Sequence, residues 1–321
     1  MSATRSGSLA ALALASGMFV SACTGAANGG TASPSDEGRA PVQVVVANYE
    51  IVAGMSSRLL VGLITEDGRT VAYGTVQMRF AKDTGGHPEA TQAVVGRYLP
   101  VHGTEPGDPN AKPSAIRPSS ARGVYAVYGV RFLESGPYLI EVAADVQGVG
   151  IVQGAARFEV IPEPDVPGVG EKVPRTDNPT LDSKEAPRAA IDSRASKGRF
   201  PDPELHRTTI AEAIQGGRPA LVVFSTPVFC LSRFCGPVTN LVQALASEYG
   251  ERAEFIHVEI WKDFQENVVN QSAADWLYRG GELNEPWAFL IGPNGRIVAR
   301  WDNLFTEDEL RSALDELHGK A

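Results

Sequence analysis

The sequence predicts two folded domains of different class, an all-β domain followed by an α/β domain. A length of 321 residues is typical of about two domains. Residues 42–161 contain short β-branched and aromatic runs, separated by Gly, Asp and Ser, with no competing helical period. From Thr208 onward, apolar runs alternate with amphipathic stretches in the order α-β-α-β-α-β-β-α, which predicts an α/β layer arrangement.

The N-terminal segment is predicted to export the chain and anchor it. The apolar run 9–20 is too short to cross a membrane and is typical of a signal peptide. The motif VSAC, which ends at Cys23, resembles the lipobox of bacterial lipoproteins, and this resemblance implies cleavage before Cys23 and lipid attachment to it. A simple secretory signal with an incidental cysteine is the alternative. We therefore expect a signal peptide and lipobox over 1–23 and a flexible tether over 24–41.

Residues 42–161 are predicted to form a β-sandwich. Six or more short strands are expected, and the stretch 138–143 alternates between two faces, as a half-buried strand does. This pattern resembles that of immunoglobulin-like (Ig-like) domains. Residues 162–203 are rich in Pro and charge with no apolar period, so they are predicted to be a linker.

Residues 204–321 are predicted to be the α/β domain. The unbroken apolar run 219–226 is typical of a strand buried on both faces, and the stretch 236–249 has the apolar stripe of a helix. The sequence Pro-Asn-Gly at 293–295 predicts a hairpin turn. Capping boxes, in which a Thr precedes a Glu by three residues, mark the start of two further helices at Thr209/Glu212 and Thr306/Glu309.

Two cysteines remain if Cys23 carries lipid, and they are predicted to form a redox-active disulfide. Cys230 and Cys235 would lie in an oxidising compartment, where such bonds persist. Five positions within one helix would place them on different faces, so residues 230–234 must loop to bring their Cα atoms within about 4.4–6.8 Å. Cys235 starts the predicted helix, where the helix dipole favours a thiolate, so it is the predicted attacking residue.

The motif Cys235-Gly236-Pro237, at a strand-to-helix junction, resembles the active site of the thioredoxin-like superfamily. The hairpin that follows Pro286 strengthens this resemblance, which covers roughly residues 204–318. It implies a thioredoxin-like fold, catalytic Cys235 and Cys230, and a substrate groove formed by Pro286, Pro237 and Gly236.

The resemblance also implies a cis peptide bond between Glu285 and Pro286. The sequence departs from the family at two points. Val238 stands where the resolving cysteine is expected, and the strand 220–226 lacks the buried carboxylate that moves protons.

The predicted function is that of a membrane-anchored, extracytoplasmic thiol–disulfide oxidoreductase that uses a Cys-x4-Cys pair. It would act on exported protein thiols or disulfides, with no cofactor and no metal, and a lipid anchor would hold it at the cell membrane. A net charge of −9 without basic clusters argues against nucleic acid as a partner.

Three alternatives remain open from the sequence. One is a non-catalytic binding lipoprotein with a structural disulfide. The stretch TPVFCLSRFC also resembles the site of a peroxiredoxin-like thiol peroxidase, in which Cys230 would react with peroxide. The cysteine pair with His257 resembles, more distantly, the copper site of the Sco-type chaperones.

Overall fold

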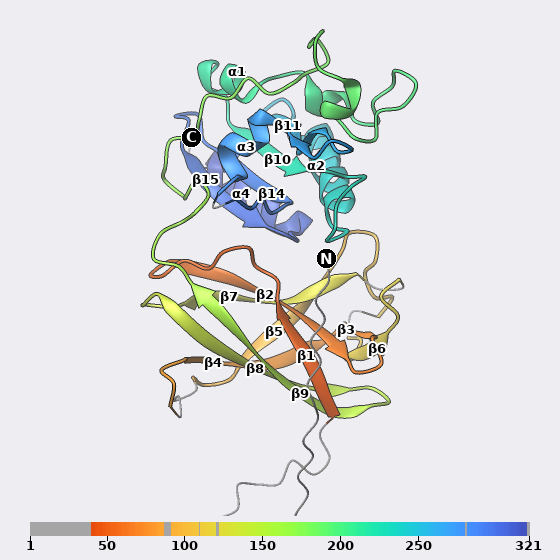
Figure 1. The fold of residues 1–321 in the computed structure, drawn as a ribbon, viewed down its shortest axis with the longest axis vertical. Helices are drawn as coiled ribbons and strands as arrows, with labels where there is room; N and C mark the ends of the chain where they lie inside the picture. The colour runs from red at the N-terminus through yellow and green to blue at the C-terminus, as the bar shows by residue number, and fades with distance from the viewer. Residues whose placement is uncertain (1–39, 87–90, 109, 120–121, 280, 320–321) are drawn as a thin grey trace, which may run out of the picture. The chain divides into compact units, whose positions relative to one another are not determined.

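The computed structural model describes residues 40–86, 91–108, 110–119, 122–279 and 281–319 (Figure 1). All described residues fall within one compact unit. The predicted signal peptide, Cys23 and all but the end of the predicted tether lie outside the described residues.

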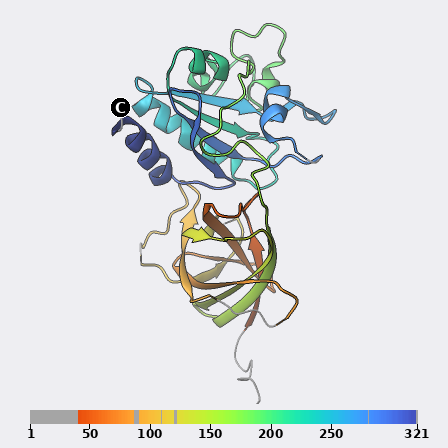
Figure 2. The same cartoon turned by 90° about the vertical axis from the view of Figure 1, so that its left-hand side faces the viewer.

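The N-terminal strands form one sheet that closes on itself. Seven strands follow the order β1-β9-β8-β4-β5-β7-β2, and a further pairing of β1 with β2 completes the ring, while β3 and β6 extend it beside β2 (Figures 1 and 2). The result is a closed seven-stranded barrel. Its strands are β1 (Ala40–Val46), β2 (Ser56–Thr65), β3 (Thr70–Ala72), β4 (Thr75–Lys82), β5 (Val94–Pro100), β6 (Ser114–Ile116), β7 (Gly123–Arg131), β8 (Gly136–Val146) and β9 (Gly150–Val160).

Alternation along the strands fills the barrel. In β4, buried Val76, Met78 and Phe80 alternate with exposed residues, as a pleated strand with one buried face requires. At the junction of β1 with β9, a Cβ added to Gly154 would overlap the backbone oxygen of Val42. The close approach that helps to close the ring therefore depends on glycine at this position.

The predicted Ig-like sandwich is wrong, because the strands form a single closed ring instead of two packed sheets. Both architectures bury one face of each strand, so both produce the same alternation in sequence. What separates the two architectures is that β1 pairs with both β2 and β9. The pairing with β9 joins residues more than 100 positions apart.

The C-terminal part contains a four-stranded mixed sheet with the order β11-β10-β14-β15. β10 is parallel to β11 and antiparallel to β14, and it is buried along its whole length. A two-stranded sheet, β12–β13, lies beyond β11 in the chain. The elements are η1 (Arg188–Ala190), η2 (Pro203–His206), α1 (Ile210–Gln215), β10 (Ala220–Ser225), α2 (Cys235–Tyr249), β11 (Glu254–Glu259), β12 (Trp261–Asp263), β13 (Val268–Val269), α3 (Gln271–Leu277), β14 (Trp287–Ile291), β15 (Ile297–Asp302) and α4 (Glu307–Gly319).

Several local predictions for this part are confirmed. Thr209 and Glu212 form a complete capping box at α1. The turn between β14 and β15 contains Gly295 at φ 70°, a left-handed conformation that glycine adopts without strain. The Glu285–Pro286 peptide bond is cis.

The predicted fold class, an Ig-like sandwich joined to a thioredoxin-like domain, is wrong for the chain. Among the described residues strand outweighs helix, and the closed barrel is the largest element of regular structure. This architecture does not fit assignment to the thioredoxin-like superfamily. The order of helices and strands along a chain leaves sheet closure and family open, since both depend on contacts between distant segments.

The Pro-rich segment 162–203 is packed, although its sequence predicted a linker. Val166 and Val173 are buried with the apolar residues on one face of the four-stranded sheet. Asp192 and Asp202 from the same segment are also fully buried. The segment therefore contributes polar groups to the interior beside the cysteine pair.

Candidate active site

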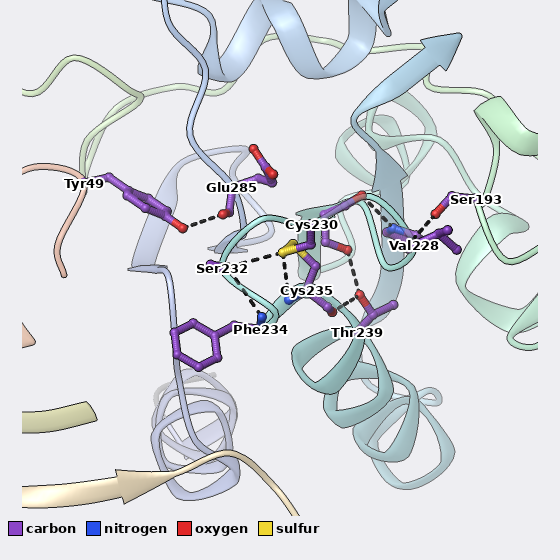
Figure 3. Close-up of a disulfide and its surroundings, with 11 residues drawn as sticks. Tyr49, Ser193, Val228, Cys230, Ser232, Phe234, Cys235, Thr239 and Glu285 are labelled. Atoms are coloured by element: carbon purple, nitrogen blue, oxygen red, sulfur yellow. Dashed lines mark hydrogen bonds between the residues drawn. A yellow bond between two sulfur atoms is a disulfide. The ribbon is translucent and has the colours of Figure 1, made fainter. Parts of the chain in front are cut away.

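The cysteine pair lies where β10 passes into α2. Cys230 and Cys235 form a disulfide with their Cα atoms 6.0 Å apart, which confirms the predicted pairing and spacing (Figure 3). Residues 226–234 form an irregular loop, as the pairing requires, and Arg233 adopts a left-handed φ of 66° within it. The two sulfur-bearing residues differ in access, because Cys235 is fully buried and Cys230 is half-buried.

Hydrogen-bond donors converge on the more accessible sulfur. The backbone N–H of Cys235, the first residue of α2, donates to Cys230 Sγ over 3.3 Å. The hydroxyl of Ser232 lies 3.2 Å from the same sulfur. Since the helix start carries a partial positive charge and no acidic side chain, these contacts favour negative charge on Cys230 Sγ when the disulfide is open.

The carboxyl group of Glu285 stands beside the disulfide. A Glu285 oxygen and the two sulfurs lie within 4.8 Å of one another. Burial raises the pKa of Glu285 to about 7, and the nearby charge of Glu259 adds to the increase. The Tyr49 hydroxyl donates a short hydrogen bond to the Glu285 backbone oxygen, which helps to hold this residue in place (Figure 3).

Apolar residues flank Cys230 in the chain. Leu231 is 94% exposed, and Val228 is also exposed. The ring of Phe229 stacks on that of Phe264, which follows β12, with centroids 4.0 Å apart. An exposed leucine next to a half-buried sulfur offers contact area for the apolar part of another molecule.

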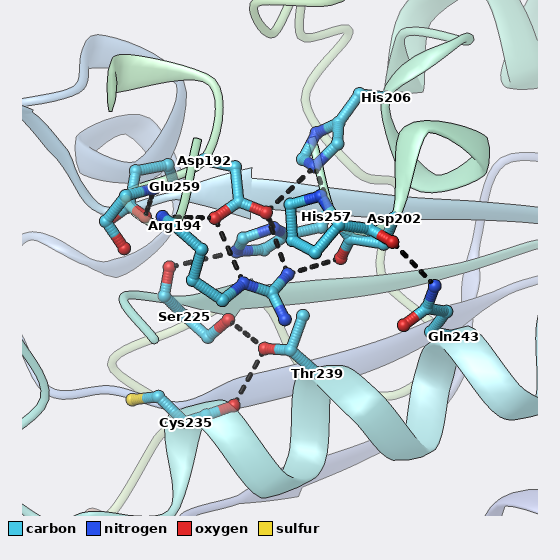
Figure 4. Close-up of polar contacts among 12 residues, drawn as sticks. Asp192, Arg194, Asp202, His206, Ser225, Cys235, Thr239, Gln243, His257 and Glu259 are labelled. Atoms are coloured by element: carbon cyan, nitrogen blue, oxygen red, sulfur yellow. Dashed lines mark hydrogen bonds and ion pairs between the residues drawn. The ribbon is translucent and has the colours of Figure 1, made fainter. Parts of the chain in front are cut away.

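A cluster of ionisable side chains, four of them fully buried, lies beside α2. We call Asp192, Asp202, His206 and His257, with the guanidinium of Arg194, the buried cluster (Figure 4). Arg194 donates to Asp192 Oδ2 over 2.7 Å and makes a short contact with Asp202. Burial lowers the pKa of His257 to about 4, so this ring is neutral at pH 7.

Hydrogen bonds connect the buried cluster with the start of α2. His257 Nε2 lies 3.2 Å from the backbone oxygen of Ser225. The Ser225 hydroxyl lies 2.6 Å from that of Thr239, which donates to the Cys235 backbone oxygen over 2.7 Å (Figure 4). Through Ser225 and Thr239, the strands β10 and β11 therefore help to position Cys235.

The remaining predicted site residues lie near the disulfide. Gly236 and Pro237 form the first turn of α2 and are half-buried, whereas Pro286 is buried directly after Glu285. Their predicted role as a substrate groove stays a prediction, as does the attacking role of Cys235.

Sequence reasoning missed Glu285 and the buried cluster. Glu285 is 50 residues from Cys235 and was considered only as the neighbour of Pro286. Asp192 and Asp202 lie in the segment that the sequence predicts to be a linker, and the sequence associates His257 only with a distant resemblance to a copper site. The weak signal in the sequence was a run of Asp, Arg and His residues between 192 and 206, next to prolines.

Within the described part of the chain, no helix has both the length and the apolar character needed to cross a membrane. The chain matches no known family profile and no curated protein. Among solved structures, it is similar to Spo0M, a sporulation control protein from Bacillus subtilis, at 13% identity and a TM-score of 0.22. That match covers 40% of this chain and half of Spo0M's length.

Proposed function

We propose that the Cys230–Cys235 pair exchanges thiols and disulfides with exported proteins. The observation that carries this proposal is the setting of the disulfide, in which one sulfur is accessible at a helix N-terminus and a carboxyl group of near-neutral pKa stands beside it. The small ring that this disulfide closes contributes only about 2 kcal/mol by the chain-entropy model, a low value for a structural cross-link.

Cys230 is the residue that meets the client in this proposal, whereas the sequence predicted Cys235. An incoming group must reach the sulfur that it attacks, and Cys235 is fully buried. The donors near Cys230 Sγ also stabilise this sulfur as a thiolate.

The exchange transfers two electrons and leaves no atom unaccounted for. A client thiolate attacks Cys230 Sγ, the bond to Cys235 Sγ breaks, and Cys235 leaves as a thiolate that takes up a proton. A second client thiolate then attacks the client sulfur of the mixed disulfide and releases Cys230. The client dithiol is oxidised to a disulfide, this protein is reduced to a dithiol, and the reverse sequence reduces a client disulfide.

Glu285 supplies the proton in this scheme. A carboxyl group with a pKa near 7 is protonated in about half of the molecules at neutral pH, which suits a group that must both donate and accept. The strand β10 offers no carboxylate, and Glu285 supplies one beside both sulfurs.

The client class follows from the N-terminal motif. Lipid attachment at Cys23 and the tether 24–41 would hold the site on the extracytoplasmic face of the membrane, where protein disulfides persist. Exposed Leu231 beside the sulfur favours partly unfolded protein substrates, which present apolar side chains near their cysteines.

A redox titration of the purified protein against glutathione or dithiothreitol tests the proposal. We expect a midpoint potential above about −300 mV, in the range of labile disulfides. A potential below that value would identify a structural bond, and the protein would then be a binding lipoprotein with a fixed disulfide.

Trapping identifies the reactive sulfur. Cys235→Ser is expected to accumulate mixed disulfides through Cys230, and Cys230→Ser is expected to trap none. The opposite pattern would restore the sequence-based assignment of Cys235. Peroxide consumption by the reduced protein, dependent on Cys230, would instead support the thiol peroxidase alternative.

A further inference from the structure

The strongest feature outside the proposed exchange reaction is the buried cluster. Its two imidazoles and two carboxylates are all 0% exposed, and each offers one atom within 4.8 Å of the others. The residues come from three places in the chain. Asp192 follows η1, and His257 lies in β11. Asp202 directly precedes η2, and His206 is the last residue of η2.

The spacing of these atoms matches the first coordination shell of a small cation. His206 Nε2 lies 3.3 Å from Asp202 Oδ1 and 3.5 Å from Asp192 Oδ2, and His257 Nδ1 lies 3.9 Å from the same Asp192 oxygen. Metal–ligand bonds of about 2.0–2.2 Å in a tetrahedron place neighbouring ligand atoms about 3.3–3.6 Å apart. A small movement of the His257 ring that shortens its 3.9 Å distance to Asp192 Oδ2 would bring this nitrogen into the same range.

Several of these atoms have no hydrogen-bond partner among the described residues. They are Asp202 Oδ1, His206 Nε2 and His257 Nδ1, together with the other ring nitrogen of His206. Their contacts with one another and with Asp192 Oδ2 are at ion-pair distances of 3.3–3.9 Å. Buried polar atoms are normally hydrogen-bonded, so three such atoms that converge on one point need an explanation. A cation at that point would bind all three.

The groups around these atoms are arranged as an outer shell. The 3.2 Å contact between His257 Nε2 and the Ser225 carbonyl places the ring proton on Nε2, which leaves a lone pair on Nδ1. Arg194 binds both carboxylates and contacts Asp202 through Oδ2, so that Asp202 Oδ1 remains directed toward the histidines.

We propose that Asp192, Asp202, His206 and His257 form a buried site for a divalent first-row metal ion, with Zn²⁺ as the best-fitting ion. Two imidazole nitrogens and two carboxylate oxygens are a ligand set that Zn²⁺ accepts, and four ligands without solvent access are typical of a structural site. The ion would fasten the segment 188–206 to β11. Through Ser225 and Thr239, it would also stiffen the start of α2.

The rival explanation is an ion network without metal. In it, a protonated His206 and Arg194 together balance the charges of Asp192 and Asp202. This arrangement leaves His257 Nδ1 unpaired, whereas a metal ion does not. The two explanations differ in one measurable property, which is the binding of one equivalent of metal.

The test uses the untagged protein with its disulfide oxidised, so that Cys230 and Cys235 cannot bind metal as thiolates. We expect elemental analysis to find up to one equivalent of zinc, and chelator treatment to lower the Tm. Adding Zn²⁺ to the stripped protein should restore the Tm, and Co²⁺ should give the visible absorption of a tetrahedral site. His206→Gln and His257→Gln should abolish this binding, whereas His102→Gln, which changes an exposed histidine, should retain it.

Two results would overturn the proposal. One is a wild-type protein that binds neither Zn²⁺ nor Co²⁺ and whose Tm does not respond to the chelator, which would establish the ion network. The other is binding that persists in both His206→Gln and His257→Gln, which would place the metal elsewhere. Because the wild-type titrations need no variant, a folding defect in the variants leaves the test intact.

Discussion

At the scale of single residues, the position of Glu285 has the clearest chemical meaning. Its carboxyl group lies beside both sulfurs, and burial places its pKa at about 7, where proton donation and acceptance are both possible. The cysteine pair itself could be predicted from sequence, since Cys230 and Cys235 are close in the chain. Glu285 could not be found this way, because the fold brings it to the sulfurs from 50 residues away.

Replacing this carboxyl group tests its role as a proton donor. Glu285→Gln is expected to slow reduction of the disulfide by a small thiol by about tenfold or more at pH 7, since positioned acids typically contribute 10²–10⁴-fold. In the wild type, the rate per attacking thiolate should fall as pH rises through about 7, because Glu285 then loses its proton. This inflection should be absent from the variant.

Glu282→Gln is the matched control, since it removes an exposed carboxylate three residues away. It should preserve both the rate and the inflection. An unchanged pH profile in Glu285→Gln would show that the proton comes from another group.

At the scale of elements, capping boxes and turn residues were predicted correctly because they depend on neighbours within a few positions. Thr209 accepts from the Glu212 backbone N–H, and the Glu212 side chain accepts from that of Thr209. The buried residues of the segment 162–203 could not be predicted, for the opposite reason. The burial of Asp192 and Asp202 depends on partners in β11 and η2, which no local period in the sequence reveals.

The capping box also gives a test of stability. Thr209→Ala is expected to lower the free energy of unfolding by about 1 kcal/mol, because the first turn of α1 loses its side-chain acceptor. Urea denaturation measures this change. Thr209→Ser keeps the hydroxyl and should stay within a few tenths of a kcal/mol of the wild type, and equal losses in both variants would point to packing of the Thr methyl group instead.

At the scale of the whole molecule, the sequence predicted where strands lie but not how they close. The alternation in β4 and β8 is equally compatible with a sandwich and a barrel. Closure depends on β1, which pairs with β2 along five residues. It also pairs along two residues with β9, which lies more than 100 positions later in the chain.

The predicted attachment to the membrane concerns the whole chain and can be tested directly. Cys23→Ser is expected to abolish incorporation of labelled fatty acid and to move the protein from the membrane fraction to the soluble fraction. The wild type should be labelled and sediment with membranes. Labelling of the Cys23→Ser variant would contradict the lipobox assignment, and an unlabelled wild type would favour a simple secretory signal.

The closing role of β1 has a mechanical consequence. This strand begins at the last two residues of the predicted tether. Tension from a membrane anchor would therefore act first on β1, which pairs with both β2 and β9 and so closes the barrel. If β1 peeled away, β2 and β9 would each present a row of unpaired backbone groups, which attract other chains. Pulling at the N-terminal end would therefore open the barrel and expose strand edges that could pair with other chains.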